Sequence, residues 1–166
     1  MAKQLLLIRH AKSDWNNAGL RDFDRPLNKR GNVNAPEMAA RLFKQNIIPD
    51  LVVSSPALRA ITTAKYFAET WQIESTKIQL EKTIYEANIK SLLAVVNHLD
   101  HQFNHVALFG HNPGLTDFAN YLSRANIFNM PTCSVVMITF PIDNWNEVSA
   151  DTGDVVFFDY PQSGED

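Results

Sequence analysis

Short apolar runs alternate along the chain with longer segments whose apolar positions recur every three or four residues. The runs QLLLI (4–8), DLVV (50–53) and HVALF (105–109) lack the apolar–polar alternation of a half-exposed strand. They are therefore predicted to be strands that are buried on both faces. Strands of this kind form parallel sheets covered by helices.

The clearest helical pattern covers residues 57–71, where apolar side chains repeat at spacings of three and four. Ser55 is its candidate N-cap, and Pro56 is expected at the first helical position because proline suits that position. These features predict a helix that follows the second strand directly.

Three further segments are predicted to be helical. One follows Asn112 as cap and Pro113 as first residue, and it carries the same apolar repeat. The segment 29–45 is also helical in pattern, although Pro36 must start, break or kink it. The segment 89–98 has a weaker repeat.

The end of the chain is rich in β-branched and aromatic residues. CSVVMITF (133–140) and DVVFFDY (154–160) flank a turn-like PIDNWN, which predicts a pair of antiparallel strands. The fold class expected is α/β, with three layers and a mostly parallel central sheet. No repeat or linker interrupts residues 1–166, so a single domain is expected, and PQSGED (161–166) is at most a frayed tail.

Composition and charge narrow the function classes. The chain has 166 residues, of which 45% are hydrophobic and 20% are charged, and its net charge is −3. This balance gives no reason to expect broad electrostatic binding to nucleic acid or to an anionic membrane. Cys133 is a single cysteine, and the apolar run near the start is too short for a signal peptide or a spanning helix. A cytoplasmic location is expected.

Polar and cationic residues follow each of the three predicted parallel strands. Arg9 and His10 follow the first, Arg59 comes shortly after the second, and His111 follows the third. Ligands of open parallel sheets bind outside the carboxyl ends of the strands, so these side chains are expected to converge on one site. Two of the strand exits lead into helix N-termini, which favour an anion.

These residue types in one crevice point to phosphate chemistry. Arginine presents a planar fork of donors that suits phosphate oxygens and stays charged. A neutral imidazole can attack phosphorus and form a covalent phosphohistidine, which splits a difficult hydrolysis into two steps. Arginines would then stabilise the charge on the transferring group.

Three motifs resemble those of the histidine phosphatase superfamily and, within it, the SixA-type phosphohistidine phosphatases. RHAKSDWN (9–16) resembles the opening RHG signature, SSPALRAITTA (54–64) the second motif and GHNPG (110–114) the late Gly-His motif. The resemblance implies a phosphoglycerate-mutase-like fold and a reaction that needs no metal or other cofactor.

The resemblance also implies roles for individual residues. It makes His10 the nucleophile, with Arg9, Arg59 and His111 as the phosphoryl-binding groups. Asn16 and Ser13 match positions that support phosphate binding in relatives with a longer first motif, and Glu86 is the candidate proton donor to the leaving group. Ala11 stands where many members have glycine, which is tolerated if its φ is negative.

The function expected is that of a metal-independent phosphatase that works through phospho-His10, with phosphohistidine on a protein as preferred substrate. The alternatives are a phosphatase for small esters, such as a sugar phosphate or nucleotide, and a non-catalytic phosphate-binding module. The partner is then a phosphorylated protein or small molecule, with no nucleic acid and no membrane; the oligomeric state is open.

Some features have simpler structural interpretations. His98, His101 and His105 have metal-site spacing but more often mark a polar helix end. RDFDRPLNKRG (21–31) is expected to be a solvated loop from which Arg21, Arg25 or Lys29 could rim the pocket. Trp15 and Trp145 are as consistent with packing as with substrate contact.

Overall fold

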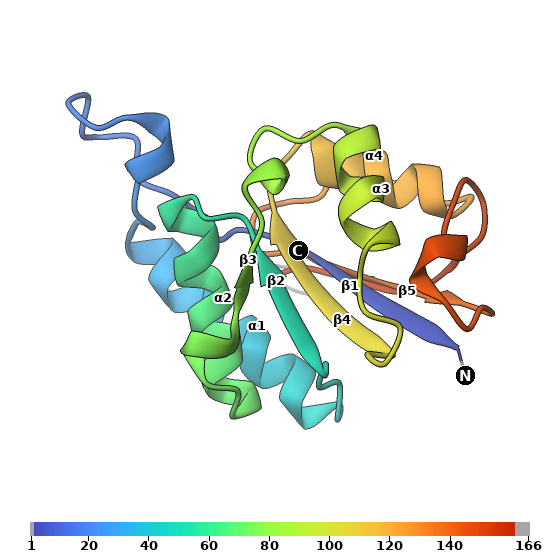
Figure 1. Ribbon diagram of the computed structural model, residues 1–166. Helices are drawn as coiled ribbons and strands as arrows, with labels where there is room; N and C mark the ends of the chain where they lie inside the picture. Colours follow the sequence, from blue (N-terminus) through green and yellow to red (C-terminus); the bar gives the residue numbers. More distant parts are fainter. Residues whose placement is uncertain (1, 162–166) are drawn as a thin grey trace.

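The computed structural model describes residues 2–161, which form one six-stranded sheet with helices on both faces (Figure 1). The strands are β1 (Lys3–Arg9), β2 (Leu51–Ser54), β3 (Gln79–Leu80), β4 (His105–Gly110), β5 (Val135–Phe140) and β6 (Asp154–Asp159). The main helices are α1 (Lys29–Lys44), α2 (Leu58–Trp71), α3 (Ile89–Asn97) and α4 (Gly114–Leu122). The strand order is β3-β2-β4-β1-β5-β6, with β5 and β6 antiparallel to their neighbours. The predicted three-layer α/β fold is confirmed.

Strand β1 shows why the apolar runs of the sequence lack the apolar–polar alternation of a half-exposed strand. Leu5 and Leu7 face the layer of α3 and α4, whereas Leu6 and Ile8 face the layer of α1 and α2. All four side chains are fully buried. Figure 1 shows these two pairs of helices on opposite sides of the sheet. Both faces of the strand are therefore core, and every position has to be apolar.

The register of the parallel strands aligns their carboxyl ends. β1 and β4 pair in parallel up to Arg9 and Gly110, and β2 and β4 pair up to Ser54 and Phe109. The next residues continue the alignment, because the backbone N–H of His10 donates to the carbonyl of Gly110 at 3.1 Å. Segments about fifty residues apart in sequence thus leave the sheet side by side, at the carboxyl ends of its parallel strands.

The start of α2 differs from the sequence prediction. The helix begins at Leu58, with Ala57 rather than Ser55 in the N-cap position. The hydroxyl oxygen of Ser55 accepts the backbone N–H of Ala57 at 3.2 Å, so Ser55 shapes the turn before the helix. Pro56 accordingly lies in that turn and not in the helix.

The start of α4 is also one residue later than predicted. Pro113 is at the cap position and Gly114 is the first helical residue. The Asn112 side chain still serves the helix end, since its Oδ1 accepts the backbone N–H of Thr116 at 3.2 Å and the Thr116 hydroxyl at 2.9 Å. Asn112 therefore accepts a hydrogen bond from the helix N-terminus as predicted, but it lies one residue before the N-cap position.

The other predicted elements are confirmed with small differences. Helix α1 contains Pro36, which neither starts nor ends it, and α3 matches the weaker helical pattern. The connection between β5 and β6 is longer than the predicted turn and includes a 3₁₀ turn at Trp145–Glu147. Sequence reasoning missed β3, a two-residue exposed edge strand without an apolar run. The predicted tail, apart from Pro161, lies outside the described residues.

Gly31 allows α1 to pack directly on the segment that follows β1. Asn28 caps α1, because its Oδ1 accepts the Gly31 N–H at 2.8 Å, and its own N–H donates to the Lys12 carbonyl at 3.0 Å. A Cβ added to Gly31 would lie 2.1 Å from the Lys12 carbonyl oxygen. Only glycine therefore permits this approach, which fixes the chain two residues after His10.

Gly31→Ala should destabilise the protein despite the helix preference of alanine. Alanine in a helix normally gains about 1 kcal/mol over glycine, but here the backbone of Lys12 has to move. We expect a net loss of about 1–3 kcal/mol in the free energy of unfolding, measured by urea denaturation. The control is Gly19→Ala, where the nearest heavy atom to the new Cβ is the Asn17 Oδ1 at 3.4 Å. Equal stability of the two variants would contradict this account.

Candidate active site

A cavity of about 280 Å³ lies at the carboxyl ends of strands β1, β2 and β4. Five of the predicted site residues line it: Arg9, His10, Ser13, Arg59 and His111. The other lining residues are Lys12, Trp15, Asp22, Arg25, Asn112 and Thr132. The cavity is thus lined by four arginine or lysine side chains and one carboxylate, although the whole chain has a net charge of −3. It is a local site for an anion.

The His10 ring is held by its own backbone neighbour. Its Nδ1 lies 2.7 Å from the carbonyl oxygen of Ala11, an oxygen that can only accept a hydrogen bond. The proton of the neutral ring is therefore on Nδ1, and Nε2 keeps a free lone pair. Ala11 is in turn fixed by the bond from its N–H to the Thr63 hydroxyl at 3.0 Å, and it is not among the described residues with positive φ. The replacement of glycine at this position is tolerated.

Burial keeps the His10 ring neutral. Loss of solvation, together with His111, Arg59 and Arg9 and against the opposing bond to Ala11, lowers the pKa of His10 to about 3. A protonated ring here would be a buried cation beside two others. The site therefore presents a neutral imidazole at physiological pH.

His111 lies close to His10, with 5.2 Å between the ring centroids. Its Nε2 is 2.8 Å from the Ser55 hydroxyl, which joins the third motif to the second. Burial and the nearby charge of Arg59, opposed by Asp22, lower the pKa of His111 to about 3. Both histidines are thus neutral in the free protein.

The arginines leave hydrogen-bond donors unused. Arg9 donates from Nη1 to the Met130 carbonyl at 2.8 Å, and Arg59 donates to the Asp22 carbonyl at 2.7 Å and to its carboxylate at 3.0 Å. Within residues 2–161, Nε of Arg9, Nε of Arg59 and Nδ1 of His111 are buried without a hydrogen-bond partner. Buried donors without partners are costly, and an oxyanion is the ligand that would satisfy them.

Sequence reasoning missed Asp22, which organises the opposite wall of the cavity. Its Oδ2 accepts from the Tyr85 hydroxyl at 2.7 Å and from Arg59, and its Oδ1 accepts from Arg25 Nε at 3.1 Å. Partial burial alone would raise the pKa of Asp22, but the bonds from Tyr85 and Arg59 hold it at about 2. Burial and the carboxylate raise the pKa of Tyr85 to about 12. Asp22 is therefore ionised and Tyr85 protonated.

Of the three residues of the predicted loop at 21–31 that could rim the pocket, Arg25 lines this cavity, and it is buried where a solvated position was expected. It donates to the Ser13 hydroxyl and lies 3.5 Å from the centroid of the Trp15 ring. Arg21 is exposed and pairs with Asp24 at 2.9 Å. The mixture of charges in this segment is typical of a solvated loop, so no local signal distinguished its buried members.

The remaining aromatic and histidine candidates fall in different places. Trp15 is 71% exposed and lines the cavity, whereas Trp145 belongs to the core. His98 ends α3, His101 is in an exposed turn and His105 begins β4. Within residues 2–161, no group of three or more histidine, cysteine or acidic residues could hold a metal ion.

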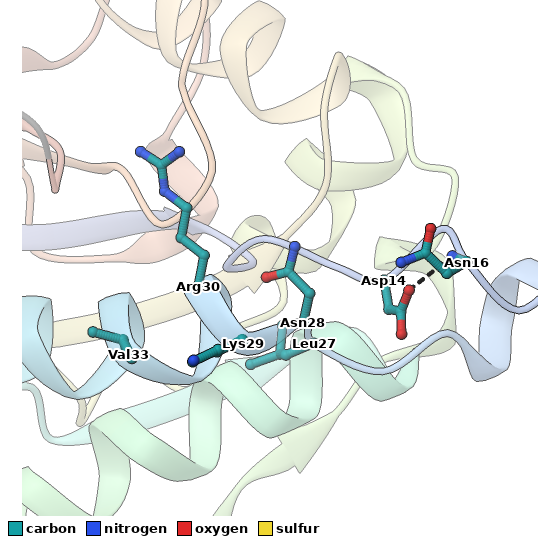
Figure 2. Close-up of a pocket in the computed structure, with 7 residues that line it drawn as sticks. All are labelled: Asp14, Asn16, Leu27, Asn28, Lys29, Arg30 and Val33. Carbon is teal, nitrogen blue, oxygen red and sulfur yellow. Dashed lines mark hydrogen bonds between the residues drawn. The ribbon is translucent and has the colours of Figure 1, made fainter.

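Two predicted site residues lie outside this cavity. Asn16 is exposed and lines a larger cavity of about 740 Å³ together with Lys29, and its N–H donates to the Asp14 carboxylate at 2.7 Å (Figure 2). Glu86 is exposed, with φ of 56°, and its sequence neighbour Tyr85 is the residue that reaches Asp22. Ser13 lines the cavity that holds His10, and its supporting role stays a prediction.

Solved structures and a curated sequence resemble this chain over most of its length. The SixA protein from Agrobacterium tumefaciens is 25% identical, with a TM-score of 0.80 over 96% of this chain and 98% of that one. A protein histidine phosphatase SixA complexed with tungstate is 19% identical, with a TM-score of 0.81 and coverage of 96% and 98%. These matches confirm the predicted phosphoglycerate-mutase-like fold.

An uncharacterized chloroplastic protein of Arabidopsis thaliana is 28% identical over 163 residues, which is 92% of this chain and 73% of that protein. The cytoplasmic location expected for the present chain stays a prediction. None of the helices in residues 2–161 is both long and apolar enough to cross a membrane.

The first two motifs lie within a segment that matches a family model. Residues 5–95, more than half of the chain, match the model of the histidine phosphatase superfamily (branch 1). The matched segment includes Arg9, His10 and Arg59, and the fold brings His111 to them. The chain therefore belongs to the histidine phosphatase superfamily.

Proposed function

We propose that the protein is a phosphatase that removes phosphate from phosphohistidine on a partner protein through a covalent intermediate on His10. Family membership and the phosphatases among its structural relatives support hydrolysis of phosphorylated substrates. The observation that carries the mechanism is the neutral, buried His10, whose Nδ1 proton is held by the Ala11 carbonyl. Nε2 is then the nucleophile that attacks phosphorus.

The phosphoryl group would be held by the cationic side of the cavity. The unused Nε donors of Arg9 and Arg59 suit its equatorial oxygens, on which charge accumulates in the transition state. The Ser55 hydroxyl oxygen already accepts from Ala57, so its own proton is available to the His111 Nε2. That bond leaves the His111 proton on Nδ1 as a further donor.

The choice of leaving group rests on the carboxyl groups near the site, since the cavity formed by the described residues is lined by no protonated carboxylic acid. Asp22, the acidic residue that lines it, has a pKa of about 2 and is ionised, and Glu86 lies outside. An alkoxide leaving group needs an acid close to it, whereas an imidazole can take a proton on its remote nitrogen near neutral pH. The cavity therefore suits a P–N bond better than an alkyl ester.

The reaction would proceed in two balanced steps. In the first, the substrate imidazole takes a proton from solvent on its remote nitrogen, and Nε2 of His10 forms a bond to phosphorus as the P–N bond of the substrate breaks; the imidazole keeps the electron pair and leaves as a neutral ring. In the second, water attacks the phosphorus of phospho-His10 as the P–Nε2 bond breaks, and the protons of the water go to the released phosphate and to solvent. His10 keeps the electron pair and its Nδ1 proton and returns to its neutral form.

His10→Ala should abolish turnover and labelling. Because the variant lacks the attacking nitrogen, kcat/KM on a phosphohistidine protein should fall by about 10³-fold or more. In the wild type, brief exposure to a ³²P-labelled phosphodonor should give acid-labile, base-stable label on His10. The matched control is His101→Ala at an exposed turn position, which should keep full activity. Full activity of His10→Ala would contradict the mechanism.

The protonation of His10 should be visible by NMR. An ordinary histidine has a pKa of about 6.5, but the pKa of His10 and that of His111 are lowered to about 3. The folded rings therefore bind a proton only in strong acid, and their ¹⁵N signals should stay those of neutral imidazole from pH 8 to about 5. Inorganic phosphate should raise both pKa values, since a dianion favours the charged rings. Titration near pH 6.5 in the phosphate-free protein would contradict the assignment.

Glu86→Gln distinguishes the P–N substrate from a small ester. Because Glu86 is exposed outside the cavity, kcat/KM on a phosphohistidine protein should change by less than about twofold. The same variant should be compared on a sugar phosphate. A large loss on the ester, with fast wild-type turnover of that ester, would favour the small-molecule alternative.

A further inference from the structure

A second cavity adjoins the catalytic one. It measures about 560 Å³ and is lined by Arg21, Asp22, Phe23, Pro56, Lys82 and Tyr85. Asp22 lines both cavities, so the two spaces lie next to one residue. The second space is therefore the nearest place for the part of a substrate that carries the phosphoryl group.

The second cavity is aromatic on the side nearest the catalytic histidines. Tyr85 packs edge to face on His111, with 5.6 Å between ring centroids, and Phe23 packs edge to face on Tyr85 at 5.2 Å. These rings form a continuous series from the phosphoryl-binding group outward. A further flat ring can pack against such aromatic side chains in the same edge-to-face or offset-stacked geometry.

The charges of the second cavity are partly balanced. Arg21 is paired with Asp24, and the Asp22 carboxylate is held by Arg59, Arg25 and Tyr85. Lys82 is exposed. The aromatic side chains are therefore the main recognition feature, next to the fixed negative charge of Asp22.

We infer that this cavity is the leaving-group subsite and that it receives the imidazole ring of the phosphohistidine side chain, an inference that rests on the proposed function. A flat five-membered ring fits against Phe23 and Tyr85, whereas phosphoserine offers only one methylene between its ester oxygen and the backbone. A phenoxide leaving group would develop negative charge close to Asp22, but imidazole leaves as a neutral ring after it takes a proton. Phe23 is thus a specificity-determining residue.

The test compares Phe23→Ala with Leu20→Ala, an apolar truncation in the same connecting segment that lines neither cavity. Two substrates share the P–N bond: a phosphohistidine peptide, which has the ring, and phosphoramidate, which lacks it. Phe23→Ala should lower kcat/KM on the peptide by about tenfold or more and on phosphoramidate by less than about threefold. Leu20→Ala should change neither by more than about twofold.

Equal losses on both substrates in Phe23→Ala, or no loss on either, would overturn the subsite. A wild type that hydrolyses neither substrate would instead overturn the proposed function. A binding measurement separates the two without turnover: wild type should bind phenylphosphonate about tenfold tighter than methylphosphonate, and Phe23→Ala should remove most of that difference. Equal affinity of the wild type for the two phosphonates would overturn the subsite independently.

Discussion

The pairing of β1 with β4 is the constraint on which the site depends. Their parallel register ends at Arg9 and Gly110, and one further backbone bond carries it to His10. This pairing sets the two histidine rings 5.2 Å apart. A slip of one residue would exchange the faces of β1, because side chains alternate along a strand, and would move its core residues to the wrong layer. The buried core of both layers therefore fixes the relative positions of His10 and His111.

The carboxyl ends of these strands also concentrate positive charge, and the burial and mutual repulsion of these charges destabilise the folded protein. Loss of solvation and the neighbouring Arg59 lower the pKa of Arg9, so the two guanidinium groups oppose each other in the free protein. Asp22 offsets part of this repulsion by its ion pair with Arg59. A phosphoryl group would supply the missing negative charge, which explains why an acidic protein can carry so cationic a cavity.

Asp22 also connects the electrostatics of the site to its chemistry. It belongs to the 3₁₀ turn Asp22–Asp24 in the segment between β1 and α1, and its bonds with Arg59 and Tyr85 tie this segment to the rest of the molecule. Because donors from three side chains keep Asp22 ionised, it cannot supply a proton, and it gives the mouth of the cavity a negative wall. In the proposed mechanism, Asp22 thus disfavours leaving groups that need a nearby acid, without touching phosphorus itself.

The sequence by itself determined the layered α/β fold, because strands buried on both faces and amphipathic helices leave unmistakable periodicities, and it identified Arg9, His10, Arg59 and His111 through motifs at strand ends. The sequence did not indicate that Asp22 lines the cavity or that Glu86 lies outside it. Those outcomes depend on how a connecting segment folds back over the sheet, and its charged residues have the same local pattern whether they are solvated or buried. Only the tertiary structure decided which of them face the site, since that depends on contacts such as Tyr85 with Asp22 between residues 63 positions apart.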